Sequence, residues 1–226
     1  MSAPNETENP RGVAVFDLDG TLTRRDTLLP FLCGYLARHP RRLLRLWRLP
    51  PAVAAYLLAG HDRALLKSRL IRIAMRGDAR AAVDRWADAF VASLRAHGAF
   101  RAAALRCVER HRRAGDALVL LSASPDLYVP RIAAALGFES TICTEVRWRG
   151  DRLDGALATA NRRGEEKRRC LLALRAEFPG RPTTAYGNSA ADLAYLGLAD
   201  RGVLVNARGA ARRAARAAGI AVDVWR

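Results

Sequence analysis

Residues 12–23 read Gly-Val-Ala-Val-Phe-Asp-Leu-Asp-Gly-Thr-Leu-Thr, and this stretch decides the fold. Residues 13–16 form an uncharged, β-branched-rich run, which is typical of a strand buried on both faces of a sheet. Asp17 and Asp19 follow directly. The period of two in an extended chain predicts that both side chains leave the strand end in the same direction. In open α/β sheets, ligands bind at that edge.

Asp17 and Asp19 form a pair whose like charges repel unless a cation lies between them. The pair therefore indicates a site for a hard metal ion. An ordinary polar exit from a strand is the alternative at this point, because Asp and Gly are frequent turn residues.

The remainder of the chain divides into two patterns. Helical periodicity dominates from residue 24 to about residue 113, with prolines at 40 and at 50–51 interrupting it. Beyond residue 100, buried-strand runs alternate with helices, and residues 145–153 read as a hairpin. This alternation predicts an α/β fold, a Rossmann-like parallel sheet flanked by helices, with an inserted all-helical cap. We expect residues 1–23 and 110–226 to form the catalytic core and residues 24–109 the cap.

Polar residues follow further strands of the predicted sheet. Ser122 and Ser124 end the run that begins at residue 117, and Asn188 and Asp192 follow the run at 183–186. Lys167 opens the helix before that run. It is one of only two lysines among 38 basic residues, in a chain that otherwise uses arginine. A compact ammonium suits a crowded phosphate site, and the set as a whole favours phosphoryl transfer to a carboxylate with a divalent cation.

These motifs resemble those of the haloacid dehalogenase-like superfamily of phosphatases, over nearly the whole chain. The large helical insertion after the first motif is similar to the phosphoserine phosphatase-like branch, subfamily IB. The motifs that carry the resemblance are Phe16-Asp17-Leu18-Asp19-Gly20-Thr21, Leu120-Leu121-Ser122-Ala123-Ser124, Lys167 with the preceding Gly164-Glu165-Glu166 and Asn161, and Gly187-Asn188-Ser189-Ala190-Ala191-Asp192.

The resemblance implies a role for each matching residue. Asp17 would be the nucleophile that forms an aspartyl-phosphate, and Asp19 the general acid and base. Ser122 and the Ala123 amide would bind phosphate oxygens, and Lys167 would bridge the phosphate and Asp17. The second aspartate favours a phosphatase, because the dehalogenase members of the superfamily lack it.

The resemblance also implies a Mg²⁺ cofactor. Its expected ligands are Asp17, Asp19 through its main-chain carbonyl, Asn188 and Asp192, the last two directly or through water. Asn188 departs from the family pattern, which has an aspartate at this position. An amide oxygen still ligates magnesium but removes one negative charge. The alternative is that Asn188 only caps the following helix.

The cap is expected to select the substrate. Its basic amphipathic segment favours contact with an anionic membrane surface, and some relatives dephosphorylate a phospholipid headgroup, phosphatidylglycerophosphate. One side of this expected helix carries arginines, and the other side carries Leu, Trp and Pro. The arginines are Arg38, Arg41, Arg42, Arg45 and Arg48. The alternative is that the apolar side of this segment packs on the rest of the cap and its arginines lie in solvent. Trp47, Trp86 and Phe90 are expected to pack in the core.

Three functions remain open at this stage. A phospholipid headgroup phosphate is the first substrate considered, and a small soluble monoester such as phosphoserine is the alternative. The non-enzyme alternative is a basic membrane- or nucleic-acid-binding protein on a decayed phosphatase fold. The net charge of +16 admits an acidic partner but equally reflects a coding bias toward arginine. No nucleic-acid motif accompanies it. Scattered cysteines predict a cytoplasmic protein, peripheral to the membrane at most. The oligomeric state is left open.

Overall fold

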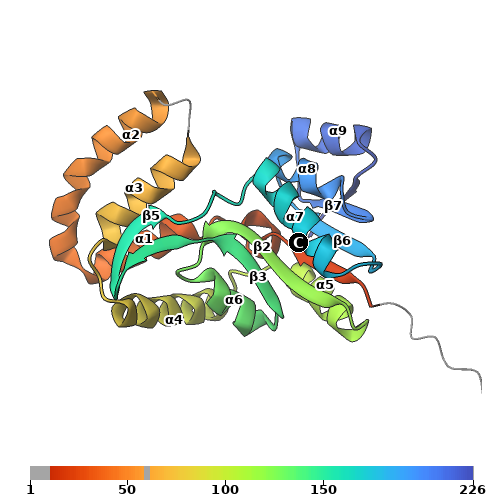
Figure 1. The fold of residues 1–226 in the computed structure, drawn as a ribbon, viewed down its shortest axis with the longest axis horizontal. Helices are drawn as coiled ribbons and strands as arrows, with labels where there is room; N and C mark the ends of the chain where they lie inside the picture. The colour runs from red at the N-terminus through yellow and green to blue at the C-terminus, as the bar shows by residue number, and fades with distance from the viewer. Residues whose placement is uncertain (1–10, 59–61, 226) are drawn as a thin grey trace, which may run out of the picture.

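The core of the molecule is a six-stranded parallel sheet. A computed structural model describes residues 11–58 and 62–225. The strand order is β3-β2-β1-β6-β7-β8, and every neighbouring pair is parallel (Figure 1). The strands are β1 Val13–Phe16, β2 Ala117–Pro125, β3 Ser140–Thr144, β6 Thr183–Gly187, β7 Arg201–Val205 and β8 Ala221–Asp223. This arrangement confirms the predicted α/β fold class.

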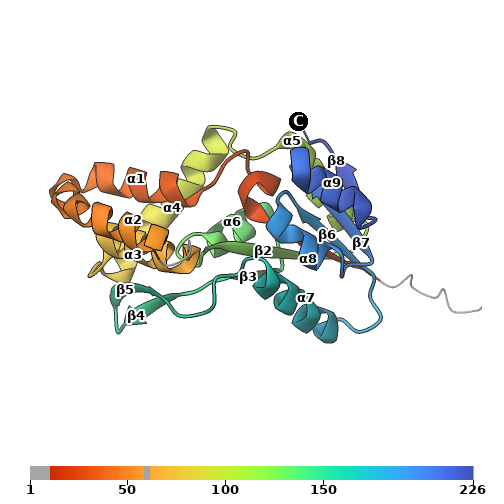
Figure 2. The ribbon, with the colours of Figure 1, turned by 90° about the horizontal axis from the view of Figure 1, so that it is seen from above.

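Helices cover both faces of this sheet (Figure 2). They are α5 Ala102–Arg113, α6 Val129–Leu136, α7 Glu165–Glu177, α8 Leu193–Leu196 and α9 Gly209–Ala217, with a 3₁₀ turn at Ala190–Asp192 before α8. Side chains along β1 alternate between the two faces of the sheet, and each face packs against its own layer of helices. Ala14 and Phe16 are buried with residues of α5 and α6, whereas Val13 and Val15 are buried with residues of α7, α8 and α9. An uncharged strand is therefore required here, because neither face meets water.

The chain leaves the core after β1 and returns before α5. Thr23 and Phe100 form an isolated antiparallel bridge at this crossing, flanked by hydrogen bonds from Arg24 N to Ala99 O (3.0 Å) and from Arg101 N to Leu22 O (2.8 Å). Helix α5 lies on the core side, where His111 Nε2 is 2.8 Å from the Tyr186 hydroxyl on β6. We therefore propose that the cap ends near residue 100 rather than at the expected residue 109.

The cap consists of helices joined by a two-stranded hairpin from the second half of the chain. The helical segments are α1 Leu28–Arg38, η2 Pro40–Arg48, α2 Leu49–Leu58, α3 Arg63–Met75 and α4 Arg80–Ala96. The antiparallel hairpin, β4 Val146–Arg149 and β5 Arg152–Leu157, is fixed to the turn between α3 and α4. Gly77 N donates to Leu153 O (2.8 Å), and Leu153 N donates to Asp78 O (2.9 Å).

Several sequence-based expectations are wrong in detail. Residues 40–48 form a 3₁₀ helix instead of an α-helix, and Pro50-Pro51 lie in the first turn of α2, where proline is tolerated, instead of interrupting it. Trp86 and Phe90 are buried as expected, but Trp47 is 69% exposed. Strand β8 was not expected. The expected tail at 1–10 and a helix start at His61 lie outside the described residues.

Candidate active site

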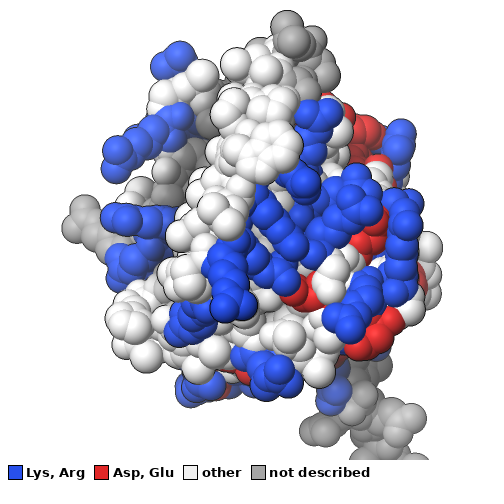
Figure 3. Space-filling view, turned by 90° about the vertical axis from the view of Figure 1, so that its left-hand side faces the viewer, with Lys and Arg blue, Asp and Glu red and all other residues white. Residues whose placement is uncertain are grey.

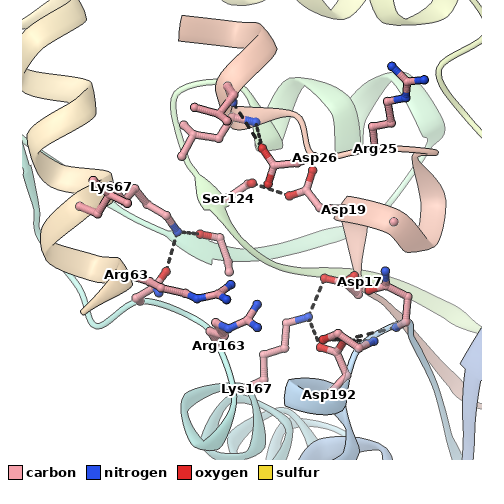
Figure 4. Close-up of a pocket in the computed structure, with 18 of the residues that line it drawn as sticks. Asp17, Asp19, Arg25, Asp26, Arg63, Lys67, Ser124, Arg163, Lys167 and Asp192 are labelled. Carbon is pink, nitrogen blue, oxygen red and sulfur yellow. Dashed lines mark hydrogen bonds and ion pairs between the residues drawn. The ribbon is translucent and has the colours of Figure 1, made fainter. Parts of the chain in front are cut away.

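Asp17 is joined to Lys167 and Asp192 in a buried ion-pair cluster at the carboxyl ends of β1 and β6 (Figure 4). Lys167, in the first turn of α7, donates to Asp17 Oδ1 at 2.6 Å and to Asp192 Oδ1 at 2.8 Å. The Thr21 hydroxyl donates to Asp17 Oδ2 at 2.8 Å. Lys167 thus orients the carboxylate from one side while Thr21 fixes it from the other.

Asp19 is held from two directions. Its Oδ1 accepts hydrogen bonds from the Thr27 amide and the Thr27 hydroxyl, both at 2.7 Å, at the start of α1. Its Oδ2 accepts one from the Ser124 hydroxyl at 2.5 Å, at the end of β2. Thr27 lies in the chain entering the cap and Ser124 in the core. Asp19 is therefore positioned at the junction of the two parts.

The turn that follows the two aspartates requires glycine at position 20. Gly20 has φ of +82°, a backbone conformation that disfavours side chains. A Cβ added at Gly20 would lie only 2.0 Å from Nδ2 of Asn188. The carboxamide of Asn188 therefore lies directly against the loop that carries Asp17 and Asp19.

Asp192 organises the loop after β6. Its Oδ2 accepts hydrogen bonds from the Ser189 hydroxyl (2.7 Å), the Ser189 amide (2.9 Å) and the Asn188 amide (3.2 Å). Ser189 and Asp192 form a reciprocal capping box at the start of the 3₁₀ turn. The residue that caps this turn is thus Ser189, which leaves the Asn188 side chain available at the site.

The carboxyl end of β2 differs from the expected arrangement. Ser122 is fully buried, its Oγ accepts a hydrogen bond from the Ser124 amide (3.0 Å), and it does not line the cavity. Ala123 and Ser124 do line it. Sequence reasoning left two roles open for Ser124, assistance in phosphate binding or a turn residue before Pro125. In the structure its hydroxyl reaches Asp19.

A cavity of about 670 Å³ opens over these groups, between the core and helices α1 to α3. Lys67 reaches into it from α3 and donates to Ala123 O and, at 2.5 Å, to Asn161 Oδ1. Burial lowers the pKa of Lys67 to about 8. Sequence reasoning did not single out Lys67. The signal was present, because Lys67 is the only lysine besides Lys167.

A family model for haloacid dehalogenase-like hydrolases matches residues 14–197, which include all of these groups. The chain belongs to this family. Among its relatives, this hydrolase is 34% identical to Protein CicA of Caulobacter vibrioides over 191 residues, 83% of each chain.

Solved structures share the fold of this hydrolase. A protein of unknown function from Bordetella pertussis matches with a TM-score of 0.79 at 21% identity, covering 95% of this chain and 99% of the other. A phosphoserine phosphatase with a phospho-aspartyl intermediate analogue matches with a TM-score of 0.65 at 13% identity, covering 96% and 94%. These likenesses concern the fold, and they agree with the branch that the sequence motifs resemble.

The carboxylates of the hydrolase differ in their proton affinity. Burial raises the pKa of Asp17 to about 6, against the opposing effect of the Lys167 ammonium. Burial also raises the pKa of Asp19, and the hydrogen bond from Ser124 opposes that rise. Burial opposes ionisation of Asp192 too, but the Lys167 ammonium outweighs it and lowers the pKa of that carboxyl. Asp192 is therefore the firmly anionic member of the cluster, and Asp19 is suited to hold a proton.

The charges of the site fit a divalent cation. Asp17 and Asp192 share a single ammonium in ion-pair contact, Lys167, so this pair of carboxylates carries one negative charge more than its cation balances. Within residues 11–58 and 62–225, no three His, Cys, Asp or Glu side chains are grouped as a metal site. The donor set expected here is instead mixed, with carboxylates, the Asn188 amide oxygen and a main-chain carbonyl, all hard oxygen ligands that Mg²⁺ prefers.

Proposed function

We propose that this hydrolase is a Mg²⁺-dependent phosphatase that cleaves phosphomonoesters through an aspartyl-phosphate. The observation that carries the proposal is the Asp17 carboxylate, which lies at the floor of the cavity, fixed by Lys167 and Thr21, with Asp19 beside it. The phosphoserine phosphatase of similar fold, which carries a phospho-aspartyl intermediate analogue, supports this chemistry.

The reaction divides into two displacements at phosphorus. Asp17 attacks phosphorus, the bond from phosphorus to the leaving oxygen breaks, and Asp19 gives its proton to the departing alcohol. Asp19 then takes a proton from water, whose oxygen attacks the aspartyl-phosphate and releases phosphate and the Asp17 carboxylate. The raised pKa of Asp19 suits this exchange of a proton.

The other site residues bind and neutralise the phosphate. Lys167 contributes positive charge, and the Ala123 amide remains our prediction for contact with the phosphate oxygens. The expected contact from Ser122 is not retained, because Ser122 does not line the cavity. Oxygens of Asp17, Asp19, Asn188 and Asp192 would hold Mg²⁺, whose charge, when the ion is bound, would let a carboxylate approach a phosphate.

A phospholipid headgroup phosphate is the substrate that we infer. The cap supports it, because large apolar side chains are exposed beside the arginines of η2, among them Leu44 at 79% and Trp47 at 69% exposure. Peripheral contact with an anionic membrane from the cytoplasmic side follows from the same surface. None of the described helices combines the length and apolarity needed to cross a bilayer.

A small soluble monoester such as phosphoserine is the alternative substrate, favoured by the likeness of fold to phosphoserine phosphatases. A non-enzymatic membrane- or nucleic-acid-binding role on a decayed phosphatase fold is less well supported. The acid–base pair and the lysine cluster are intact and mutually oriented in the structure.

Phosphate release across a panel of monoesters tests the proposal. The panel contains phosphoserine, sugar phosphates, nucleotides and phosphatidylglycerophosphate in micelles, each with Mg²⁺ and with chelator. We expect Mg²⁺-dependent release that Asp17→Asn abolishes and that Asp88→Asn, an exposed carboxylate paired with Arg131, leaves intact. Turnover that survives Asp17→Asn would refute the nucleophile. A higher rate of release from phosphoserine than from the micellar lipid would show that the substrate is a small soluble monoester and not the phospholipid that we infer.

A further inference from the structure

Helix α3 presents two different faces to two different cavities. One face, spaced three and four residues apart, lines the catalytic cavity with Arg63, Leu66, Lys67 and Leu70. A second face with the same spacing, about 120° away by helical geometry, lines a separate hollow of about 210 Å³. The residues around this hollow are Arg48, Pro51, Arg69, Arg72, Ile73 and Arg76.

The hollow is strongly basic. Four of the six residues that line it are arginines, and none is acidic. Arg69 donates to Pro51 O (3.2 Å), and Arg48 stacks on the Trp47 ring at 5.2 Å. Arg72 bonds to Asp154, but Arg147 shares that carboxylate at 2.6 Å, so the acid does not compensate the remaining arginines. Guanidinium groups gathered without acids are suited to a phosphate.

The 3₁₀ geometry of η2 places an apolar ridge beside the hollow. Residues three apart align in a 3₁₀ helix, so Leu44 and Trp47 share one stripe, and Arg45 and Arg48 share the next. Arg45 donates to Arg76 O, which fixes the arginine stripe against the end of α3. Leu44 and Trp47 project outward, 79% and 69% exposed. Figure 3 shows this end of the molecule, where Lys and Arg side chains gather in the middle of the face and acidic side chains lie mainly to their right.

We propose that the hollow is a headgroup site, in which Arg48, Arg69 and Arg76 bind the phosphate of an anionic phospholipid and dock the cap on the bilayer surface. Leu44 and Trp47 enter the interfacial region beside it, where an aromatic side chain is favourable. The basic hollow is complementary to a negatively charged headgroup, and the apolar ridge beside it suits the membrane interface. Together these two features favour an anionic bilayer as the partner of this surface. The inference rests on the proposed membrane contact and assigns the contact to residues outside the catalytic cavity.

The docking also orients the enzyme. Because both cavities lie along α3, a bilayer at the second face comes within about one helix diameter, roughly 10 Å, of the catalytic cavity. The headgroup site is thus a place where a lipid is held without being hydrolysed, since Asp17 is absent from its lining.

Vesicle co-sedimentation of the full chain tests the site. Vesicles of phosphatidylglycerol and phosphatidylcholine are compared with vesicles of phosphatidylcholine alone. We expect the triple variant Arg48→Gln, Arg69→Gln, Arg76→Gln to bind the anionic vesicles at least about tenfold more weakly than wild type, because each arginine near an anionic surface adds to affinity. Leu44→Ala with Trp47→Ala should weaken binding independently. The matched control is Arg212→Gln, Arg213→Gln, Arg216→Gln in α9, which removes the same charge from exposed positions in the core.

The outcomes separate this inference from the proposed function. Equal loss in the two triple variants would overturn the headgroup site and leave membrane contact as a general charge effect. Failure of wild type to sediment with anionic vesicles would overturn both the contact and the site. Thermal stabilisation of wild type, but not of the hollow variant, by inorganic phosphate without vesicle binding would show a soluble-anion site instead. Asp17→Asn should bind vesicles as wild type does, since the hollow does not include it.

Discussion

The hydroxyl of Ser124 lies 2.5 Å from Oδ2 of Asp19, so a residue at the end of β2 orients the carboxylate that follows β1. The bond crosses between adjacent strands of the sheet and is independent of the cap. It fixes one carboxylate oxygen and leaves the other to Thr27.

Ser124→Ala should lower kcat roughly 10- to 100-fold, because a hydrogen bond to a charged group is worth about 1.5–3 kcal/mol. KM should change little, since the role that we propose for Asp19 is proton transfer and not substrate binding. Steady-state kinetics with p-nitrophenyl phosphate measure both values. Ser124→Thr keeps the hydroxyl and should restore most of the rate. Equal kcat in Ser124→Ala and wild type would exclude the positioning role.

Lys167→Met should destabilise the fold by about 3–5 kcal/mol, because it leaves Asp17 and Asp192 buried without their shared cation. Urea unfolding gives the free energy. Arg168→Met removes a side chain that pairs with Glu165 on the surface. It is the neighbouring control and should change stability by less than about 0.5 kcal/mol. Lys167→Arg should fail to restore activity, because a forked guanidinium does not fit the space of an ammonium. A fully active Lys167→Arg would contradict this account.

Arg63 and Arg163 line the catalytic cavity (Figure 4) and form no ion pair with any described residue. We expect Arg63→Gln or Arg163→Gln to raise KM about tenfold for a monoester with a second negative group, since one charged hydrogen bond is lost. The KM for p-nitrophenyl phosphate, which has no second anion, serves as the internal control. A parallel rise for both substrates would place the arginines on the reacting phosphate instead.

Asp126 predicts a pH dependence of stability outside the catalytic cluster. Burial raises the pKa of Asp126 to about 6, and the Glu145 carboxylate adds to the rise. The pKa of Asp126 in the folded protein lies above its ordinary value. The protonated carboxyl therefore adds to the free energy of unfolding below about pH 4, and this contribution is lost as the pH rises through 6. Asp126→Asn resembles the protonated form and keeps an acceptor for the Val146 amide.

The Asn variant should therefore be more stable than wild type at pH 8, by up to about 2 kcal/mol, and lose this advantage at pH 4. Thermal unfolding at the two pH values measures the difference. The exposed Asp151→Asn provides a reference for removal of a charge alone. An advantage for Asp126→Asn that is the same at both pH values would rule out titration as its cause.

Local patterns in the sequence were sufficient to predict five of the six strands of the sheet and the meeting of Asp17, Lys167 and Asp192 at its edge. The bounds of β1 are those expected. An uncharged run that ends at Asp17 is typical of a strand buried on both faces of a parallel sheet. Asp17, Lys167 and Asp192 meet because the ends of parallel strands share one edge of the sheet.

Features that depend on tertiary contacts were beyond a single sequence. The 3₁₀ period of η2 cannot be told from an α-helical one in a short arginine-leucine run, so Trp47 was assigned to the wrong face. Ser122 and Ser124 share one side of an extended strand, and only the neighbouring loop decides which hydroxyl meets Asp19. Strand β8 has three residues, too few for a period to be recognised.

The hairpin β4–β5 makes the cap an assembly of two chain segments. Leu153 forms hydrogen bonds with the turn after α3, and Asp154 forms a salt bridge with Arg72 of that helix. Both Leu153 and Asp154 lie beyond β3 in the sequence. Exchanging residues 24–100 between homologues would therefore transplant an incomplete unit, with Arg72 parted from its carboxylate. Substrate specificity in this protein should evolve, and be engineered, by paired changes in two distant stretches of the gene.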